Sequence, residues 1–337
     1  MKIDAPLLDS SFAGAAPLAR SHAAASFDGV FTFDGPHDPF TALALAAEHT
    51  RLDIATGVAI ALARSPMTVA QVAHDLQSFS SGRFTLGLGS QVRAHVERRF
   101  SMPWSRPVDR MKEFVAALRA IFSCWNDDAP LQFDGEFYRH TLMPPLLRPA
   151  PCSHGAPPIV LAAVGRQMLE AAGEVADGWV THPFHSLRYL ETFALPAIAA
   201  GRARRSSALA EDFHVVAQVL VVTGSDEGEL AASREAVRAQ IAFYASTQAY
   251  RPVLEADGEG ELQSELRGLT RQGRWSEMAR LVTDAMVERY AIVGQPEAAG
   301  RELRLRYAKI AGRVAIATPM LLRPETAGRL VAGFHGI

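Results

Sequence analysis

Short apolar runs alternate with amphipathic segments along most of the chain, and the two kinds of segment differ in period. Apolar runs bounded by glycine or polar residues predict strands, and apolar residues that repeat every three or four positions predict helices. The expected strands are 3–7, 29–33, 53–60, 84–88, 159–163, 178–181, 214–223 and 314–318. The expected helices lie within 13–25, 39–49, 67–79, 107–122, 166–175, 187–200 and 324–334. The pattern therefore predicts a series of strand–helix units.

Repeated strand–helix units favour parallel strands, and eight of them close a (β/α)8 barrel, the TIM barrel. We expect this α/β fold as a single domain over residues 1–337. The mostly helical segment at about 226–307 is too long for one crossover, so we expect it to be an insertion before the last strand. An open doubly wound sheet is the alternative, but the G-x-G-x-x-G sequence typical of its first turn is absent after 3–7.

In a barrel of this kind, functional residues follow the carboxyl ends of the strands. His182 and His37 are candidates for acid–base chemistry at these ends, because the unperturbed pKa of histidine is near neutrality. Asp34 either takes part in the same chemistry, contacts a ligand, or caps the helix that follows it. For Asp38, directly before Pro39, a helix cap is the better interpretation, since proline is favoured at the first helical position.

Two further strand ends carry small residues of the kind that surround a phosphate. Ser90 and Gln91 follow the fourth strand, and the sequence Val164-Gly165-Arg166-Gln167 follows the fifth and opens a helix. Backbone N–H groups at a helix start, together with a hydroxyl and an arginine, bind phosphate. The alternative is that the glycines only turn the chain, because isolated glycine motifs are weak signals.

Gly57 and Val58 lie inside an otherwise apolar strand, which is unusual for glycine. Glycine in a strand interior marks a bulge, a close approach by a ligand, or tight packing under a helix. The sequence alone does not separate these three interpretations.

Composition narrows the class of protein. Lys and Arg number 34 against 36 Asp and Glu, and the resulting formal charge of -2 disfavours nucleic-acid binding. With only Cys124 and Cys152, a disulfide framework is excluded, and the histidines lack metal-ligand spacing, so we expect no metal. The sequence has no apparent signal peptide or membrane span, and no G-x-S-x-G nucleophile sequence. We therefore expect a cytoplasmic protein that binds a small molecule.

Several motifs occur in a fixed order over nearly the whole chain. They are LDIATGV at 52–58, SSGRF at 80–84, LGLG at 86–89, PVDR at 107–110, FDGEF at 133–137, AGEVADGW at 172–179 and IVGQPE at 292–297. Each motif alone is weak, but the ordered set resembles the bacterial luciferase-like superfamily of flavin- or deazaflavin-dependent oxidoreductases. The segment 90–100, SQVRAHVERRF, resembles members that use coenzyme F420.

The resemblance implies a barrel with an insertion before the last strand and a tricyclic cofactor across the carboxyl-terminal mouth. It places Gly57 and Val58 at a non-prolyl cis peptide bond behind the cofactor ring. It also places Ser90, Gln91 and residues 164–167 at the phosphate, and Asp34 near the ring. A homodimer is expected on the same ground.

The expected activity is F420-dependent hydride transfer to or from a small organic substrate. The alternatives are an FMNH2-dependent monooxygenase supplied by a separate flavin reductase and a non-catalytic cofactor-binding protein. Two positions differ from those of the F420-dependent sugar-phosphate dehydrogenases. Those enzymes have a histidine directly after the aspartate that ends the second strand, and a glutamate two residues after the hydroxyl residue that ends the fourth strand. Here these positions are Gly35 and Val92, so a sugar phosphate is not the expected substrate.

Overall fold

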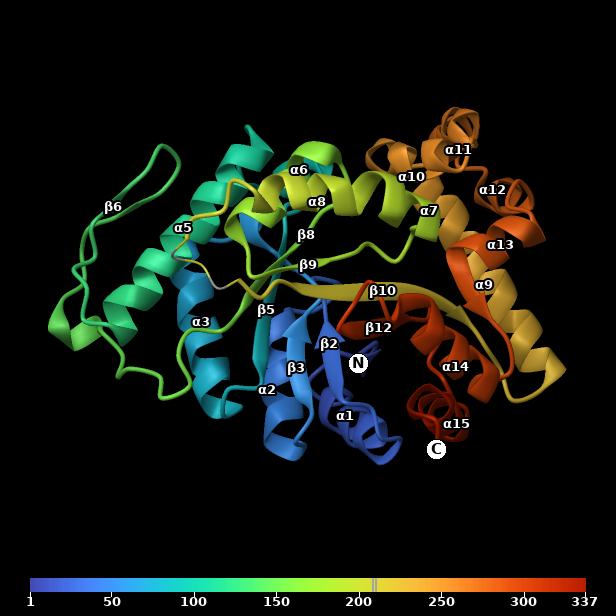
Figure 1. Cartoon of the computed structure of the whole chain (residues 1–337), viewed down its shortest axis with the longest axis horizontal. Coiled ribbons are helices and arrows are strands. Elements are labelled where there is room, and N and C mark those ends of the chain that lie inside the picture. Colours follow the sequence, from blue (N-terminus) through green and yellow to red (C-terminus); the bar gives the residue numbers. More distant parts are fainter. Residues whose placement is uncertain (208, 210) are drawn as a thin grey trace.

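Eight parallel strands close into a barrel in the computed structural model, which describes residues 1–207, 209 and 211–337 (Figure 1). Around the barrel the strands are β1 (Lys2–Pro6), β2 (Gly29–Thr32), β3 (Asp53–Thr56), β5 (Phe84–Gly89), β8 (Ile159–Ala162), β9 (Gly178–Val180), β10 (His214–Val222) and β12 (Arg313–Ala317). The ring closes because β10 pairs with both β9 and β12, and β12 pairs with β1. The predicted TIM barrel is thereby confirmed.

Two strand predictions need correction. The expected strand 53–60 is divided at Gly57–Val58 into β3 and the short β4 (Ala59–Ile60), which pairs with β5. A further strand, β11 (Ala291–Val293), lies in the segment expected to be helical and extends the sheet beside the end of β10. Its three apolar residues directly follow a helix, so the sequence pattern does not distinguish them from a continuation of that helix.

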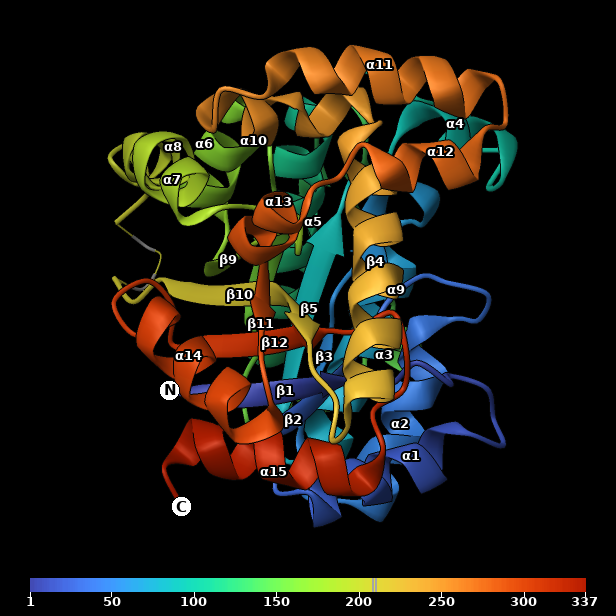
Figure 2. The same cartoon turned by 90° about the vertical axis from the view of Figure 1, so that its right-hand side faces the viewer.

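Helices surround the barrel (Figure 2). Those between the barrel strands are α1 (Ala15–Ala24), α2 (Pro39–His49), α3 (Pro66–Phe79), α4 (Arg93–Arg98), α5 (Pro107–Asn126), α6 (Arg166–Val175), α7 (Leu187–Tyr189) and α8 (Leu195–Arg202), and α15 (Pro324–His335) follows β12. Single turns lie at Ala61–Ala63, Pro145–Leu147 and Leu190–Ala194. None of the helices formed by the described residues is both long and apolar enough to cross a membrane.

The chain between β10 and β12 is largely helical and stands on one side of the barrel (Figure 1). Its helices are α9 (Glu227–Ala245), α10 (Arg251–Ala256), α11 (Gly260–Arg271), α12 (Trp275–Arg280), α13 (Asp284–Tyr290) and α14 (Pro296–Tyr307), with a 3-10 turn at Gln248–Tyr250. At the other end of the molecule, β6 (Phe133–Asp134) and β7 (Arg139–His140) form a small antiparallel hairpin (Figure 1).

Helix starts follow the local sequence. Asp38 accepts hydrogen bonds from the backbone N–H groups of Phe40 and Thr41 at 3.0 and 3.3 Å, with Pro39 at the first position of α2. This confirms the cap predicted for Asp38. Ser65 caps α3 in the same way, again directly before a proline. Such caps satisfy N–H groups that have no partner inside the helix.

Candidate functional site at the carboxyl-terminal mouth of the barrel

The carboxyl ends of the parallel strands meet at one end of the barrel, so the segments that follow them lie close together. β5 and β8 are neighbours, with Leu88 opposite Leu161. Ser90 and Val164 therefore leave the barrel from adjacent strands. The structure thus brings the two predicted phosphate-binding segments together at the mouth, although they are more than seventy residues apart in sequence.

The first of these segments has an ordered turn. The Ser90 hydroxyl donates to the carbonyl of Gln91 at 3.2 Å, and Gln91 adopts a left-handed conformation with φ of 60°. The side-chain oxygen of Gln91 accepts from the N–H of Val92 at 3.0 Å. The oxygen of the Ser90 hydroxyl and the amide nitrogen of Gln91 keep hydrogen-bonding capacity for a ligand.

The second segment is the start of α6, where Gly165 occupies the cap position. Glycine has no side chain to cap the first N–H groups, and the first turn of α6 contains no acidic residue. A Cβ atom built on Gly165 would meet no atom within 4 Å, so the space above this helix start is open. In contrast, Asp38 fills the same position in α2 with a carboxylate. No side chain of the described residues caps these N–H groups, so the start of α6 presents them and the positive end of a helix dipole to an open space, as an anion requires.

The remaining groups of this segment have definite positions. The Val164 carbonyl accepts a hydrogen bond from the Tyr189 hydroxyl at 2.5 Å, which fixes the approach to the helix. The Arg166 guanidinium lies over the Phe193 ring at 5.2 Å and 3.9 Å from the Glu170 carboxylate. Arg166 and Gln167 thus offer their backbone N–H groups, while the Arg166 side chain contacts its own helix and a neighbouring turn.

The strand interruption at Gly57 and Val58 is a cis peptide bond, as the family resemblance implies. The Gly57 N–H donates to the Thr32 carbonyl at 2.7 Å, and the Val58 carbonyl accepts from the Asp34 N–H at 3.2 Å. The Gly57 carbonyl accepts from the side-chain amide of Gln218 at 3.1 Å. Backbone groups of β2 and of the loop after it, with a side chain from β10, thus hold both sides of this peptide.

Two glycines of β5 make room for the interruption. A Cβ on Gly87 would lie 1.9 Å from the Thr56 carbonyl oxygen, and one on Gly89 would lie 2.8 Å from a methyl group of Val58. The Thr56 hydroxyl donates to the Gly87 carbonyl at 2.7 Å and accepts from the Gly87 N–H at 2.8 Å. The LGLG sequence is therefore required by close packing of β5 against the segment 56–58.

Asp34 lies at the mouth, but its carboxylate is fully engaged by the protein. Its two oxygens accept from the Arg64 guanidinium at 2.6 and 2.7 Å, and one also accepts from the Ile60 N–H at 2.6 Å. The Asp34 side chain is only 6% exposed. These contacts fix the carboxylate in place and join the loop after β2 to the turn after β4. The role of Asp34 in proton transfer stays a prediction.

The two candidate histidines differ in their surroundings. His37 is exposed on the loop after β2, so it is available to solvent but is not fixed by the fold. His182 follows β9 and is partly buried, and its Nδ1 accepts from the Phe184 N–H at 3.2 Å. Burial, with a smaller contribution from His185, lowers the pKa of His182 to about 3. A pKa this low leaves the His182 ring neutral near pH 7, and its role in acid–base chemistry stays a prediction.

Sequence reasoning did not identify two residues that shape the site. Gln218 crosses the barrel interior to Gly57, and it interrupts the otherwise apolar run 215–222. A buried amide in such a run is a signal that could have been used, because buried polar groups require partners. Arg64 had no comparable signal, since its partner Asp34 is thirty residues away.

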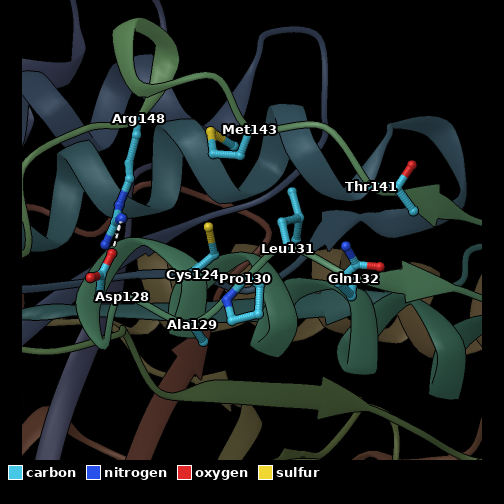
Figure 3. Close-up of a pocket in the computed structure, with 9 residues that line it drawn as sticks. All are labelled: Cys124, Asp128, Ala129, Pro130, Leu131, Gln132, Thr141, Met143 and Arg148. Atoms are coloured by element: carbon cyan, nitrogen blue, oxygen red, sulfur yellow. Dashed lines mark hydrogen bonds and ion pairs between the residues drawn. The ribbon is translucent and has the colours of Figure 1, made fainter.

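Another concave surface lies apart from the mouth. A hollow of about 350 Å³ is formed at the carboxyl end of α5 and the following chain, with Arg148 paired to Asp128 at its edge (Figure 3). Helices of a barrel run back from the mouth, so the end of α5 lies near the opposite end of the strands. Within the described residues, no group of three or more His, Cys, Asp or Glu is placed to hold a metal ion.

Comparison with known proteins identifies the family. The family model described as luciferase-like monooxygenase matches residues 2–313. The chain belongs to this family. An uncharacterized protein of Mycobacterium tuberculosis is 47% identical over 315 residues, which cover 93% of this chain and 92% of the relative. A second M. tuberculosis protein, provisionally named a coenzyme F420-dependent oxidoreductase, is 29% identical over 306 residues, covering 83% of each chain.

Solved structures of other proteins share the fold of this luciferase-like chain. The coenzyme F420-dependent tetrahydromethanopterin reductase from Methanopyrus kandleri is similar with a TM-score of 0.76 and 19% identity, covering 98% of this chain and 97% of the other. EDTA monooxygenase from Chelativorans is similar with a TM-score of 0.72 and 17% identity, covering 99% and 92%. The chain thus shares its fold with a reductase and with a monooxygenase.

Proposed function

We propose that this luciferase-like protein is an F420-dependent oxidoreductase that transfers a hydride to or from a small organic substrate. The observation that carries the proposal is the open helix start at Gly165 beside Ser90 and Gln91, at the mouth of the barrel. The choice of F420 rests on the M. tuberculosis relative and on the named activity of the Methanopyrus reductase.

The residues at the mouth fit a phosphate-bearing cofactor. The uncapped N–H groups of Arg166 and Gln167 would hold the phosphate, with the side-chain amide of Gln91 as a further donor. The Ser90 hydroxyl would become a donor to the phosphate only by turning its proton away from the Gln91 carbonyl. Val58, supported through Gly57 by Gln218, would lie against the cofactor ring. When bound, F420 supplies hydride donation or acceptance, and the protein contributes binding, orientation and shielding from water.

FMN is the alternative cofactor, and with it an FMNH2-dependent monooxygenase that requires a flavin reductase. Both cofactors present a phosphate, so the start of α6 accommodates either. The ion pair of Asp34 with Arg64 and the packing of β5 against 56–58 are equally compatible with both rings. Binding measurements with the two cofactors separate these reactions.

The variant Gly165→Leu tests the site. Its side chain would enter the space over the start of α6, where a Cβ meets no protein atom, so the fold has no cause to change. We expect F420 binding, followed by the change in F420 fluorescence, to weaken at least tenfold while the circular dichroism spectrum and melting temperature stay as in the wild type. Gly312→Leu is a control, because Gly312 also faces open space but precedes β12 at the other end of the barrel. Equal F420 affinity in the wild type and Gly165→Leu would refute the phosphate-site assignment.

A further inference from the structure

His182 is enclosed by two tyrosines from the segment inserted between β10 and β12. The Tyr250 ring stacks on the imidazole with centroids 4.2 Å apart and an interplanar angle of 26°. The Tyr244 ring meets it edge-on at 4.5 Å and 83°. Tyr244 lies in α9 and Tyr250 in the turn before α10, so both aromatic neighbours come from a segment more than sixty residues away in sequence. The insertion thus fixes the plane of a histidine at the mouth of the barrel.

Hydrogen bonds fix the tautomer of the same ring. The Nδ1 atom of His182 accepts from the Phe184 N–H at 3.2 Å, so the neutral ring carries its proton on Nε2. Among the described residues, no side chain or backbone oxygen accepts a hydrogen bond from this Nε2–H, and the ring is partly exposed. This Nε2–H is not cut off from solvent, so the oxygen of a ligand at the mouth can replace water as its acceptor. His182 therefore offers one free, oriented N–H at the mouth.

The surroundings hold this ring neutral. The carbonyl of His182 accepts from His185 Nδ1 at 2.7 Å, and His185 Nε2 accepts from the Tyr307 hydroxyl at 3.0 Å. Burial lowers the pKa of His185 to about 4, so this neighbour is neutral too. No carboxylate contacts the His182 ring within the described part of the chain. The titratable or charged groups that face His182 and His185 are Tyr244, Tyr250, Tyr307 and Arg306. Burial raises the pKa values of the three tyrosines.

We infer that Tyr250 and Tyr244 are positioning residues that hold His182 as a neutral Nε2–H donor to the reacting oxygen of a carbonyl or alcohol substrate. This inference rests on the proposed function, because hydride transfer between F420 and such a substrate changes the charge on that oxygen. A neutral imidazole stabilises a developing oxyanion by hydrogen bonding while keeping its own proton. The proton that accompanies the hydride would pass between the substrate oxygen and water, in either direction, while His182 keeps its own. The role assigned to His182 is therefore hydrogen-bond donation and not proton abstraction.

The inference is tested on the protein without cofactor, by NMR of ¹³C- and ¹⁵N-labelled histidine between pH 5 and 8. The variant His182→Gln identifies the signal of His182 by its loss. We expect the wild-type signal to report the neutral Nε2–H tautomer at every pH in this range. Tyr250→Phe keeps the stacked ring, so its His182 signal should match the wild type. Tyr250→Ala admits water, and there His182 should titrate with a midpoint above pH 5.

Tyr138→Ala is the matched control, because Tyr138 packs on Phe114 and Arg110 beside α5 and touches neither histidine. It should leave the His182 signal unchanged. The inference is overturned if wild-type His182 titrates between pH 5.5 and 7, if it carries its proton on Nδ1, or if Tyr250→Ala leaves its titration unchanged. F420 titrations of the wild type and of His182→Gln distinguish failure of this inference from failure of the proposed function. His182→Gln should still bind F420, because the role assigned to His182 concerns the substrate. A wild-type protein that does not bind F420 would refute the proposed function alone.

Discussion

The ion pair between Asp34 and Arg64 provides a sharp test of how the mouth is held together. The variant Arg64→Met removes the guanidinium and keeps most of the side-chain volume. Asp34 would then retain one hydrogen bond, from the Ile60 N–H at 2.6 Å, and lose the two to Arg64. Its side chain is 6% exposed, whereas that of Arg64 is 19% exposed.

The expected loss follows from these contacts. Removing one partner of a buried ion pair costs about 3–5 kcal/mol, because the remaining charge is left without compensation. Arg64 is partly reached by water, so we expect the lower end, about 3 kcal/mol of unfolding free energy. Asp34→Asn should cost a similar amount, since its amide N–H groups would face those of Arg64. The double variant with Arg64→Met and Asp34→Asn contains neither charge. Its loss of unfolding free energy should therefore be smaller than the sum of the two single losses.

Urea unfolding of the four proteins, followed by tryptophan fluorescence, gives the coupling energy of the pair from a double-mutant cycle. We expect a coupling of about 2 kcal/mol. Arg93→Met is the control, because Arg93 pairs with Glu97 at 3.0 Å on the exposed surface of α4 and its loss should leave stability unchanged. Additive losses, or an Arg64→Met variant as stable as the Arg93 control, would refute the view that Asp34 anchors the mouth.

Two further predictions concern packing and pH. Gly87→Ala would place a Cβ 1.9 Å from the Thr56 carbonyl oxygen and should destabilise the protein by about 3 kcal/mol. Gly328→Ala, in open space on α15, should instead be neutral or stabilising in the same urea assay. Burial lowers the pKa values of His22, His182 and His185 from 6.5 to about 4, 3 and 4, so at pH 5.5 the unfolded chain binds protons that the folded protein does not. Stability should therefore fall as the pH drops from 7.5 to 5.5, by about 1.4 kcal/mol for each histidine. His22→Leu should remove about a third of this dependence, and equal stability at the two pH values would contradict it.

The periodicity of the sequence was sufficient to predict the barrel because each strand and helix is encoded locally. The cap at Asp38 was also predictable, since its partners lie two and three residues away. β11 was missed because three apolar residues beside a helix have no period of their own. The apolar pattern predicted 53–60 as one strand, whereas the family resemblance implied the interruption at Gly57–Val58 that divides it.

Contacts between distant segments could not be predicted in the same way. Gln218 and Gly57 are 161 residues apart, and Asp34 and Arg64 are 30 residues apart, so only the closed barrel brings each pair together. The surroundings of His182 depend on the path of the insertion, which places Tyr244 and Tyr250 against its ring. Sequence position suggested a titrating histidine, whereas these long-range contacts make it neutral.

The central claim is that the open helix start at Gly165 and the turn at Ser90 bind the phosphate of F420. The most direct measurement is a paired fluorescence titration of the purified protein with F420 and FMN, each in oxidised and reduced form. We predict saturable binding of F420 that is tighter than binding of FMN, and loss of F420 binding in Gly165→Leu. Preferential binding of FMNH2 would contradict this account and indicate a two-component monooxygenase.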